Sequence, residues 1–153
     1  MKFTCYTEIN LPVKVVSALF NDPNNSERWQ EGFISRQHIR GIPGDPGAKS
    51  RITILHGKKR IILTETIIYK NLPFELDALY EHENMVNTLA NRFISLEENK
   101  TRYEAQVEYM KFIGFVPNMM AMLMPGTFKR QTQKWINSFK AFAESEGRSS
   151  KRR

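Results

Sequence analysis

Apolar and polar residues alternate through much of the first 112 residues, and the spacing becomes helical near the end of the chain. Phe3–Ile9 and Thr101–Phe112 alternate in this way, which predicts strands with one buried face. From Phe128 onward the apolar residues recur three and four positions apart, at Phe128, Trp135, Ile136, Phe139, Phe142 and Ala143. This spacing predicts one long helix with a single apolar face, which needs a broad apolar surface to pack on.

Two short helical segments and a series of strands are predicted between these ends. Pro12–Phe20 is predicted to be a helix because proline in the first turn loses no hydrogen bond, and Ser26–Gln30 is predicted to form a second turn. The predicted strands are Phe33–Arg40, Lys49–His56, Arg60–Tyr69, Phe74–His82, Asn87–Leu96 and Thr101–Phe112. Their connections are mostly too short to cross over, so neighbouring strands must be antiparallel. With the opening strand, they predict a curved seven-stranded α+β sheet covered by the C-terminal helix.

Length and composition indicate one soluble domain. The chain has 153 residues, and we expect a single domain over residues 1–146 followed by a disordered basic tail over 147–153. No apolar run reaches eighteen residues, so no transmembrane segment is expected. Cys5 is the only cysteine, which excludes an internal disulfide and favours a cytoplasmic location.

The net charge of +7 is confined to the C-terminal part of the chain. Residues 1–110 carry 14 basic and 14 acidic side chains, whereas residues 111–153 carry 9 and 2. The aromatic residues among these charges follow the spacing of a helix core and do not form a platform for stacking bases. We therefore expect no nucleic-acid partner, and binding of nucleic acid through the basic tail is the minor alternative. The oligomeric state is left open.

Several short motifs, taken in their order, resemble a known superfamily. They are Asn10-Leu11-Pro12 before the first helix, Asp22-Pro23 through Trp29, Pro46-Gly47, Leu72-Pro73, and the amphipathic final helix. Over residues 3–145 this order resembles the START-related (SRPBCC) ligand-binding proteins, which include polyketide cyclases and lipid-transfer domains. The resemblance implies the helix-grip fold and a ligand cavity between the sheet and the long helix. It implies no reaction, because the superfamily has no universal catalytic motif.

A cavity in that position has a predicted lining. The expected lining residues are Tyr80, Phe93, Tyr103, Val107, Tyr109, Met119, Met120, Leu123, Phe128, Trp135 and Phe139. Residues 119–124 contain four methionines, whose flexible side chains suit varied apolar partners, although methionine is also common as ordinary core filler. Arg92 and Glu65 are the candidate polar anchors for a ligand, provided that they point inward.

These observations favour binding of a small hydrophobic molecule, such as a lipid, an isoprenoid or a polyketide-like compound, by a carrier or sensor. A cyclase or dehydratase that uses the same cavity is the alternative. A further alternative is a module whose basic C-terminal helix docks on a protein or a membrane surface. No spacing indicates a catalytic pair, a metal site or a cofactor motif, and His38, His56 and His82 are scattered.

Overall fold

The computed structural model describes residues 1–114 and 125–151. The elements are β1 (Lys2–Ile9), α1 (Val13–Asn21), the 3-10 turn η1 (Pro23–Asn25), α2 (Ser26–Trp29), β2 (Phe33–Arg40), β3 (Lys49–His56), β4 (Lys59–Asn71), β5 (Glu75–His82), β6 (Met85–Glu97), β7 (Lys100–Phe112) and α4 (Pro125–Lys151). All the expected strands and helices are present, most of them within two residues of the expected ends. No helix in the described ranges is long and apolar enough to cross a bilayer.

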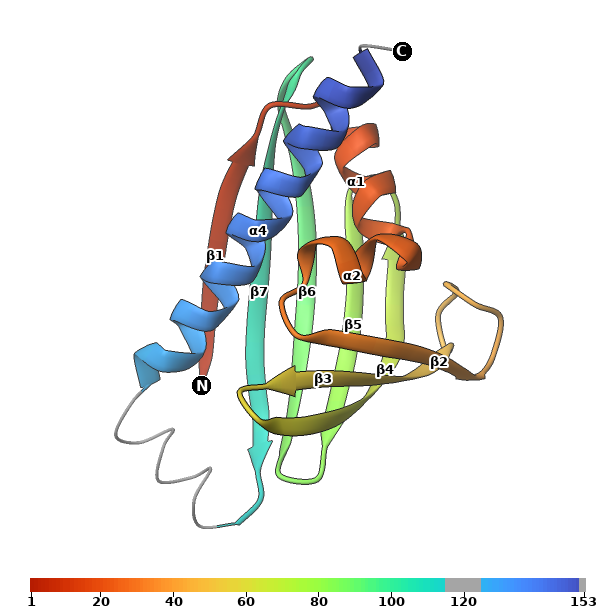
Figure 1. Cartoon of the computed structure of the whole chain (residues 1–153), viewed down its shortest axis with the longest axis vertical. Helices are drawn as coiled ribbons and strands as arrows, with labels where there is room; N and C mark the ends of the chain where they lie inside the picture. Colours follow the sequence, from red (N-terminus) through yellow and green to blue (C-terminus); the bar gives the residue numbers. More distant parts are fainter. Residues whose placement is uncertain (115–124, 152–153) are drawn as a thin grey trace.

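The seven strands form one antiparallel sheet. Their order is β1-β7-β6-β5-β4-β3-β2, so β2 to β7 follow one another as a meander and β1 joins beside β7 (Figure 1). This confirms the predicted α+β fold with a seven-stranded antiparallel sheet, two short helices after the first strand, and a long C-terminal helix.

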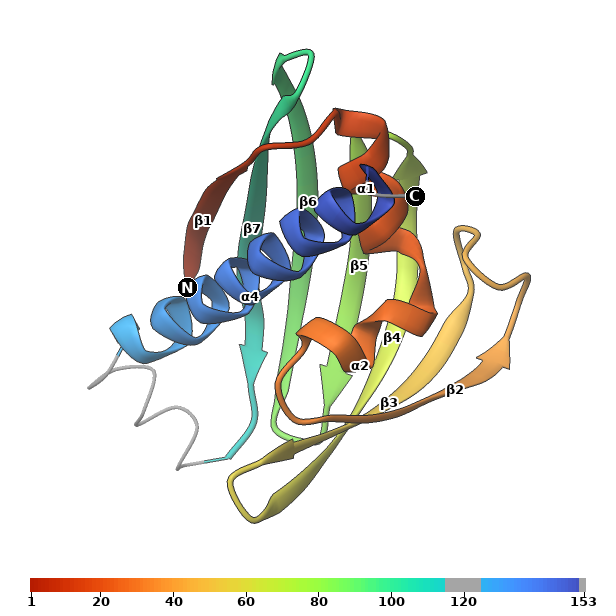
Figure 2. The ribbon, with the colours of Figure 1, turned by 45° about the horizontal axis from the view of Figure 1, so that its top comes forward.

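The sheet is strongly curved. Register shifts interrupt the pairing of β2 with β3, β4 with β5, and β6 with β7, and extra residues of this kind bend a strand and increase its twist. As a result β2 and β3 run across β5, β6 and β7 on the side where α1, α2 and α4 lie (Figures 1 and 2). The concave face of the sheet is therefore the face that the helices cover.

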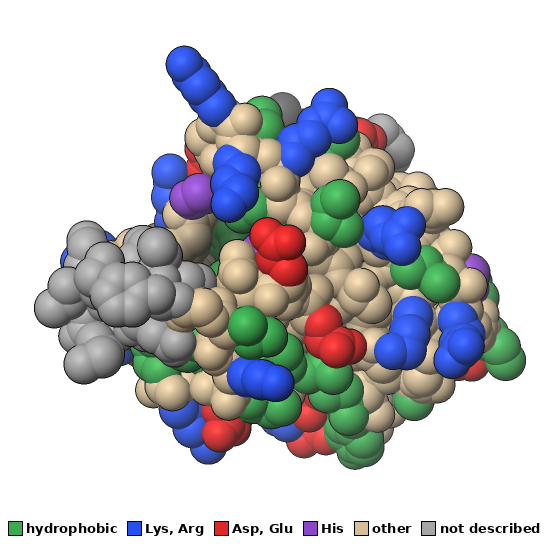
Figure 3. Space-filling model, turned by 90° about the horizontal axis from the view of Figure 1, so that it is seen from below, with side chains coloured by type: hydrophobic (Ala, Val, Ile, Leu, Met, Phe, Trp, Pro, Cys, Tyr) green, Lys and Arg blue, Asp and Glu red, His purple; other side chains and the backbone are tan. Residues whose placement is uncertain are grey.

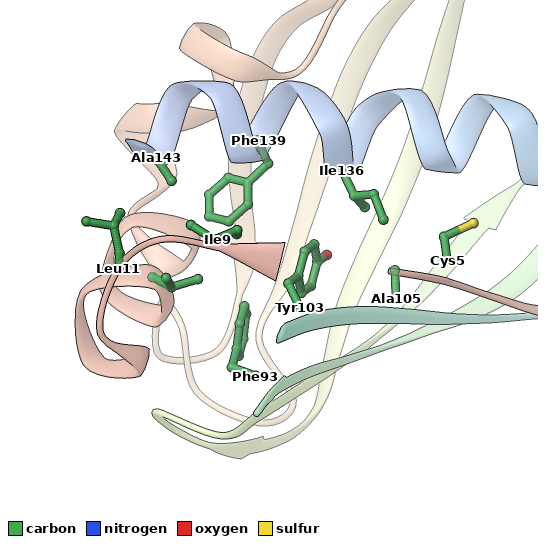
Figure 4. Packing of buried hydrophobic residues seen from close by; sticks show 10 residues of the cluster. Cys5, Ile9, Leu11, Phe93, Tyr103, Ala105, Ile136, Phe139 and Ala143 are labelled. Atoms are coloured by element: carbon green, nitrogen blue, oxygen red, sulfur yellow. The ribbon is translucent and has the colours of Figure 1, made fainter. Parts of the chain in front are cut away.

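An aromatic core closes one part of this concave face. The ring of Phe20 from α1 lies 5.3 Å from that of Phe139 on α4 and 5.4 Å from those of Phe93 and Tyr103 on the sheet. Phe93 and Tyr103 stack at 5.1 Å across β6 and β7. Figure 4 shows Phe139 pointing from α4 toward these sheet residues. Burial of each such ring stabilises the fold by about 2–3 kcal/mol, so this cluster fixes α4 on the sheet.

The C-terminal end of α4 is held by the first part of the chain. The backbone N–H of Asn10 donates to Glu144 Oε2 at 3.2 Å, and Arg28 pairs with Glu146. Gly147 is buried against Leu11. The helix continues to Lys151, so within the expected disordered tail (147–153) residues 147–151 are helical, and residues 152–153 lie outside the described residues.

Candidate ligand-binding site

One row of cross-strand neighbours on the concave face is polar across six strands. Each member is paired in register with the next, and the members are His38, Ser50, Glu65, Tyr80, Asn87 and Tyr109. Residues paired directly across an antiparallel sheet carry their side chains on the same face, and Glu65 is buried on the inner one. We call this set the polar row.

Apolar residues flank the polar row. On the side of the aromatic core, Ile67, Ala78, Leu89 and Val107 are paired in succession from β4 to β7. On the other side, the pairs Ile52–Leu63 and Ile54–Ile61 join β3 and β4. An apolar surface with a few convergent polar groups is the usual composition of a small-molecule site.

Glu65 is the centre of the polar row. Its side chain accepts two hydrogen bonds, from the Tyr80 hydroxyl to Oε2 at 2.8 Å and from Arg36 Nη1 to Oε1 at 2.5 Å. Arg36 stands on β2 opposite the buried Ile52, so it also faces inward. Both partners donate toward Glu65, which suits its carboxylate form. The three side chains thus form one hydrogen-bonded cluster from three different strands.

Burial and neighbouring charges set the protonation states of Tyr80, Arg36 and Tyr109. Burial raises the pKa of Tyr80 well above its ordinary value, and the nearby charge of Glu65 raises it further. For Arg36, burial acts to lower the pKa, but the charge and hydrogen bond of Glu65 outweigh burial and the pKa rises. Burial also raises the pKa of Tyr109 to about 12. At neutral pH the guanidinium is therefore charged and both phenols are neutral.

Some buried donors have no acceptor among the described residues. Only Nη1 of Arg36 has an acceptor among them, and its buried Nε has none. The indole Nε1 of Trp135 on α4 is also buried without an acceptor in the described ranges. Buried polar atoms usually have partners, so these donors are candidates for a bound molecule or water.

Helix α4 covers the polar row at one end. The ring of Phe128, near the start of α4, lies 5.0 Å from that of Tyr109. Further along, α4 packs on β1, where Cys5 Sγ donates to the carbonyl of Lys129 at 3.5 Å. Several inward-facing side chains toward the middle of the sheet are only half-buried, namely Leu63, Ile67, Tyr80, Asn87 and Leu89. The concave face is thus tightly closed at the aromatic core and more accessible beside the polar row.

The predicted lining residues divide between these two regions. Tyr80 and Tyr109 belong to the polar row, Val107 lies in the adjacent apolar row, and Phe128 packs on Tyr109. Phe93, Tyr103 and Phe139 have at most 2% of their surface exposed and lie in the closed aromatic core. Trp135 is half-buried on α4. Met119, Met120 and Leu123 lie outside the described residues.

The two candidate anchors lie on opposite faces of the sheet. Glu65 points inward as required, but Arg92 does not. Arg92 pairs with Asp77 and approaches Glu75 at 3.7 Å on the outer face, because its neighbour Phe93 faces the core and successive strand residues alternate. Arg92 was a candidate only if it pointed inward, and the structure does not meet that condition.

Sequence reasoning missed Arg36, Ser50 and Asn87 as site residues. Each stands in a strand that was correctly located, yet nothing in its neighbours distinguishes an inward polar residue from a solvated one. The signal lies in the register between strands, which brings these residues into line with Glu65 and Tyr80.

The exterior shows weaker features. Two shallow depressions lie along the outward side of α4, one lined by Arg130, Gln133, Lys134 and Asn137 and the other by Tyr6, Glu8, Gln133 and Lys140. At the end of the molecule that carries the β5–β6 turn, Lys and Arg side chains are spread among acidic and apolar ones (Figure 3). On that face no concentrated basic patch is visible.

Solved structures with the same arrangement are numerous, although their sequences differ strongly. The Zhui aromatase/cyclase from Streptomyces sp. R1128 superposes with a TM-score of 0.81 at 10% identity, over 98% of this chain and 97% of that one. A START superfamily protein from Mycobacterium smegmatis gives 0.73 at 10% identity, over 94% and 97%. The di-domain ARO/CYC StfQ of the steffimycin biosynthetic pathway gives 0.72 at 10% identity, over 97% of this chain and 46% of that one.

Sequence comparison adds nothing to this likeness, since no family model and no curated protein matches the chain. Identities near 10% establish a shared fold and leave ligand and reaction open. The curved sheet, the two short helices and the long C-terminal helix agree with these structures over nearly the whole chain. The chain therefore has the START-related helix-grip fold, as the order of its motifs predicted.

Proposed function

We propose that this protein binds a small, largely apolar molecule against the concave face of its sheet, between the polar row and α4. The observation that carries the proposal is the polar row itself, a line of polar side chains set between apolar rows and flanked by half-buried residues. Desolvating the partly buried Arg–Glu–Tyr cluster costs free energy, which supports a role for it beyond packing. A lipid, an isoprenoid or a polyketide-like aromatic compound fits this composition, and the role is that of a cytoplasmic carrier or sensor.

Catalysis of a cyclisation or dehydration is the second candidate function. The observation in its favour is that the neutral Tyr80 phenol and the Arg36 guanidinium both contact Glu65 on an apolar face. In such a cluster the guanidinium stabilises a developing enolate, and the carboxylate that Tyr80 and Arg36 hold in place accepts a proton. Among the solved proteins of this fold are an aromatase/cyclase and an ARO/CYC protein. Turnover of a bound compound, measured against a Tyr80→Phe variant, separates an enzyme from a carrier.

Ligand binding is tested first on the freshly purified protein. Native mass spectrometry should detect an adduct that organic solvent removes, and the neutral fluorescent probe N-phenyl-1-naphthylamine should bind with enhanced emission. Ala78→Leu places extra atoms in the apolar row beside the polar row, and it should reduce probe binding at least fivefold.

Ala90→Leu is the matched control, because Ala90 pairs with Asp77 on the outer face of the same sheet. It should leave probe binding unchanged. The proposal would be refuted if the purified protein carried no adduct and also failed to bind the probe. It would also be refuted if Ala78→Leu and Ala90→Leu changed probe binding equally. Thermal unfolding checks that both variants are folded.

A further inference from the structure

We propose that the polar row recognises an uncharged oxygen of the ligand, a ketone carbonyl or a hydroxyl, and that it disfavours a carboxylate. This inference rests on the proposed function, because it names the chemical class of the molecule bound at the same face. It follows from the charges and hydrogen-bonding groups that the described residues bring together there.

The charge of the cluster is already balanced. Arg36 carries one positive charge and Glu65 one negative charge, and their atoms Nη1 and Oε1 are 2.5 Å apart. Tyr80 is held neutral by burial and by Glu65. His38, at the end of the row, is exposed and contacts the carbonyl of Gly41 through Nε2 at 2.7 Å. An incoming carboxylate would thus add an uncompensated charge beside Glu65, and desolvating it costs several kcal/mol.

The available hydrogen-bonding groups suit an uncharged oxygen. The guanidinium of Arg36 keeps donors beyond Nη1 that no described residue accepts. Tyr80 uses its hydrogen on Glu65, so its oxygen has lone pairs left for a ligand hydroxyl. Asn87 and Ser50, the neighbours of Tyr80 and Glu65 in the row, make no side-chain hydrogen bond within the described ranges. A carbonyl or a hydroxyl therefore finds both donors and acceptors at this position.

Arg92 forms a similar ion pair on the outer face of the sheet and can be compared with Arg36. Arg92 also pairs with a carboxylate on a neighbouring strand, through Nη1 and Nη2 to Asp77, but on the outer face. The Arg92–Asp77 pair has the same chemical groups as the Arg36–Glu65 pair, but it lies on the face of the sheet that the helices do not cover. It provides a control of matched chemistry in the same protein.

Three probes of one skeleton test the inference: 2-ethylnaphthalene, 2-acetylnaphthalene and 2-naphthoate. Each is measured at pH 7.5 by displacement of N-phenyl-1-naphthylamine. We expect 2-acetylnaphthalene to bind about tenfold more tightly than 2-ethylnaphthalene, since a hydrogen bond to a charged group is worth about 1.5 kcal/mol or more. We expect 2-naphthoate to bind more weakly than either.

Three substitutions test whether the Arg36–Glu65–Tyr80 cluster causes the preference for the ketone. Arg36→Met should reduce the advantage of 2-acetylnaphthalene at least threefold and leave 2-ethylnaphthalene within twofold, because the ketone accepts from the guanidinium. Tyr80→Phe should leave that advantage within twofold, because the Tyr80 hydroxyl donates to Glu65 and not to the ketone. Glu65→Gln leaves the Arg36 charge without its partner, so 2-naphthoate should gain about tenfold and rise above the ketone. Arg92→Met and Asp77→Asn, on the outer face, should keep the wild-type order.

The outcomes separate this inference from the proposed function. If none of the probes binds wild-type protein, the proposed function itself fails. If 2-ethylnaphthalene binds and 2-acetylnaphthalene has no advantage, or if 2-naphthoate is the tightest, the proposed function stands and this inference is overturned. If Glu65→Gln does not fold, the wild-type order and the Arg36→Met variant still decide the question.

Discussion

Gly147, in the last turns of α4, lies directly against the side chain of Leu11, which follows β1. A Cβ atom at position 147 would come within 2.3 Å of Leu11 Cδ2. Leu11 has only 6% of its surface exposed and belongs to the hydrophobic core. The absence of a side chain at Gly147 thus lets the end of α4 pack closely on the segment that links β1 to α1.

Gly147→Ala should lower the free energy of unfolding by about 1–2 kcal/mol, because overpacking of Leu11 outweighs the better helix propensity of alanine. Chemical denaturation measures the change. Gly126→Ala, near the other end of α4, is the control, since a Cβ there has Arg130 Nη1 as its nearest atom at 3.6 Å. This control should be neutral or slightly stabilising. A more stable Gly147→Ala protein would contradict the close packing described above.

Phe139→Ala should destabilise the protein by about 3–5 kcal/mol, because it removes a fully buried ring from the aromatic core. Phe128→Ala, at the more accessible end of α4, should cost clearly less. The two variants are compared by urea unfolding followed through tryptophan fluorescence. Equal losses would indicate that both ends of the concave face are packed to the same extent.

Glu65→Gln should cost about 2–4 kcal/mol of stability, since it leaves the partly buried guanidinium of Arg36 without its counter-charge. Asp77→Asn, which disturbs the outer pair with Arg92, should cost about 1 kcal/mol or less. Differential thermal unfolding at pH 7.5 provides the comparison. If the order were inverted, the outer pair and not the inner one would be the structural ion pair.

Stability should fall as the pH rises above about 10. Burial raises the pKa of Tyr109 to about 12, and the pKa of Tyr80 is also raised, so the folded protein holds their protons where the unfolded chain releases them. This contribution is complete below the unfolded value near 10 and is lost toward the folded value, at about 1.4 kcal/mol per pH unit for each tyrosine. Urea unfolding from pH 9 to 11.5 measures the slope, which Tyr109→Phe should reduce. An unchanged slope in Tyr109→Phe would argue against burial of that phenol.

Cys5 should resist thiol reagents in the folded protein. It has 1% of its surface exposed, and burial raises the pKa of its thiol. Reaction with 5,5′-dithiobis(2-nitrobenzoic acid) should therefore be slow in buffer and fast in denaturant. Rapid reaction in buffer would show that the contact between β1 and α4 opens readily.

The local pattern of the sequence was enough to locate nearly every element. Alternation in the strands and three-and-four spacing from Phe128 depend only on neighbouring residues, and short connections force an antiparallel meander. The inward direction of β7, with Tyr103 and Val107 buried, also followed from alternation alone. The continuation of α4 to Lys151 could not be predicted from local pattern. The contacts near its end involve Leu11 and Asn10, which are more than a hundred residues away in the chain.

The sequence by itself determined the elements, their order and the fold. Only the tertiary structure decided which polar side chains share the concave face. β6 carries polar and apolar residues on both of its sides, since Asn91 shares a side with Phe93 and Arg92 shares a side with Ile94. Its own pattern therefore does not indicate the inward side, and pairing with β5 and β7 decides it. The same pairing aligns Glu65 with Tyr80 and brings Arg36 to it from β2. Register is a long-range property, set by how the whole sheet packs on α4 and the aromatic core, and for that reason local pattern named Glu65, Tyr80 and Tyr109 but not Arg36, Ser50 and Asn87.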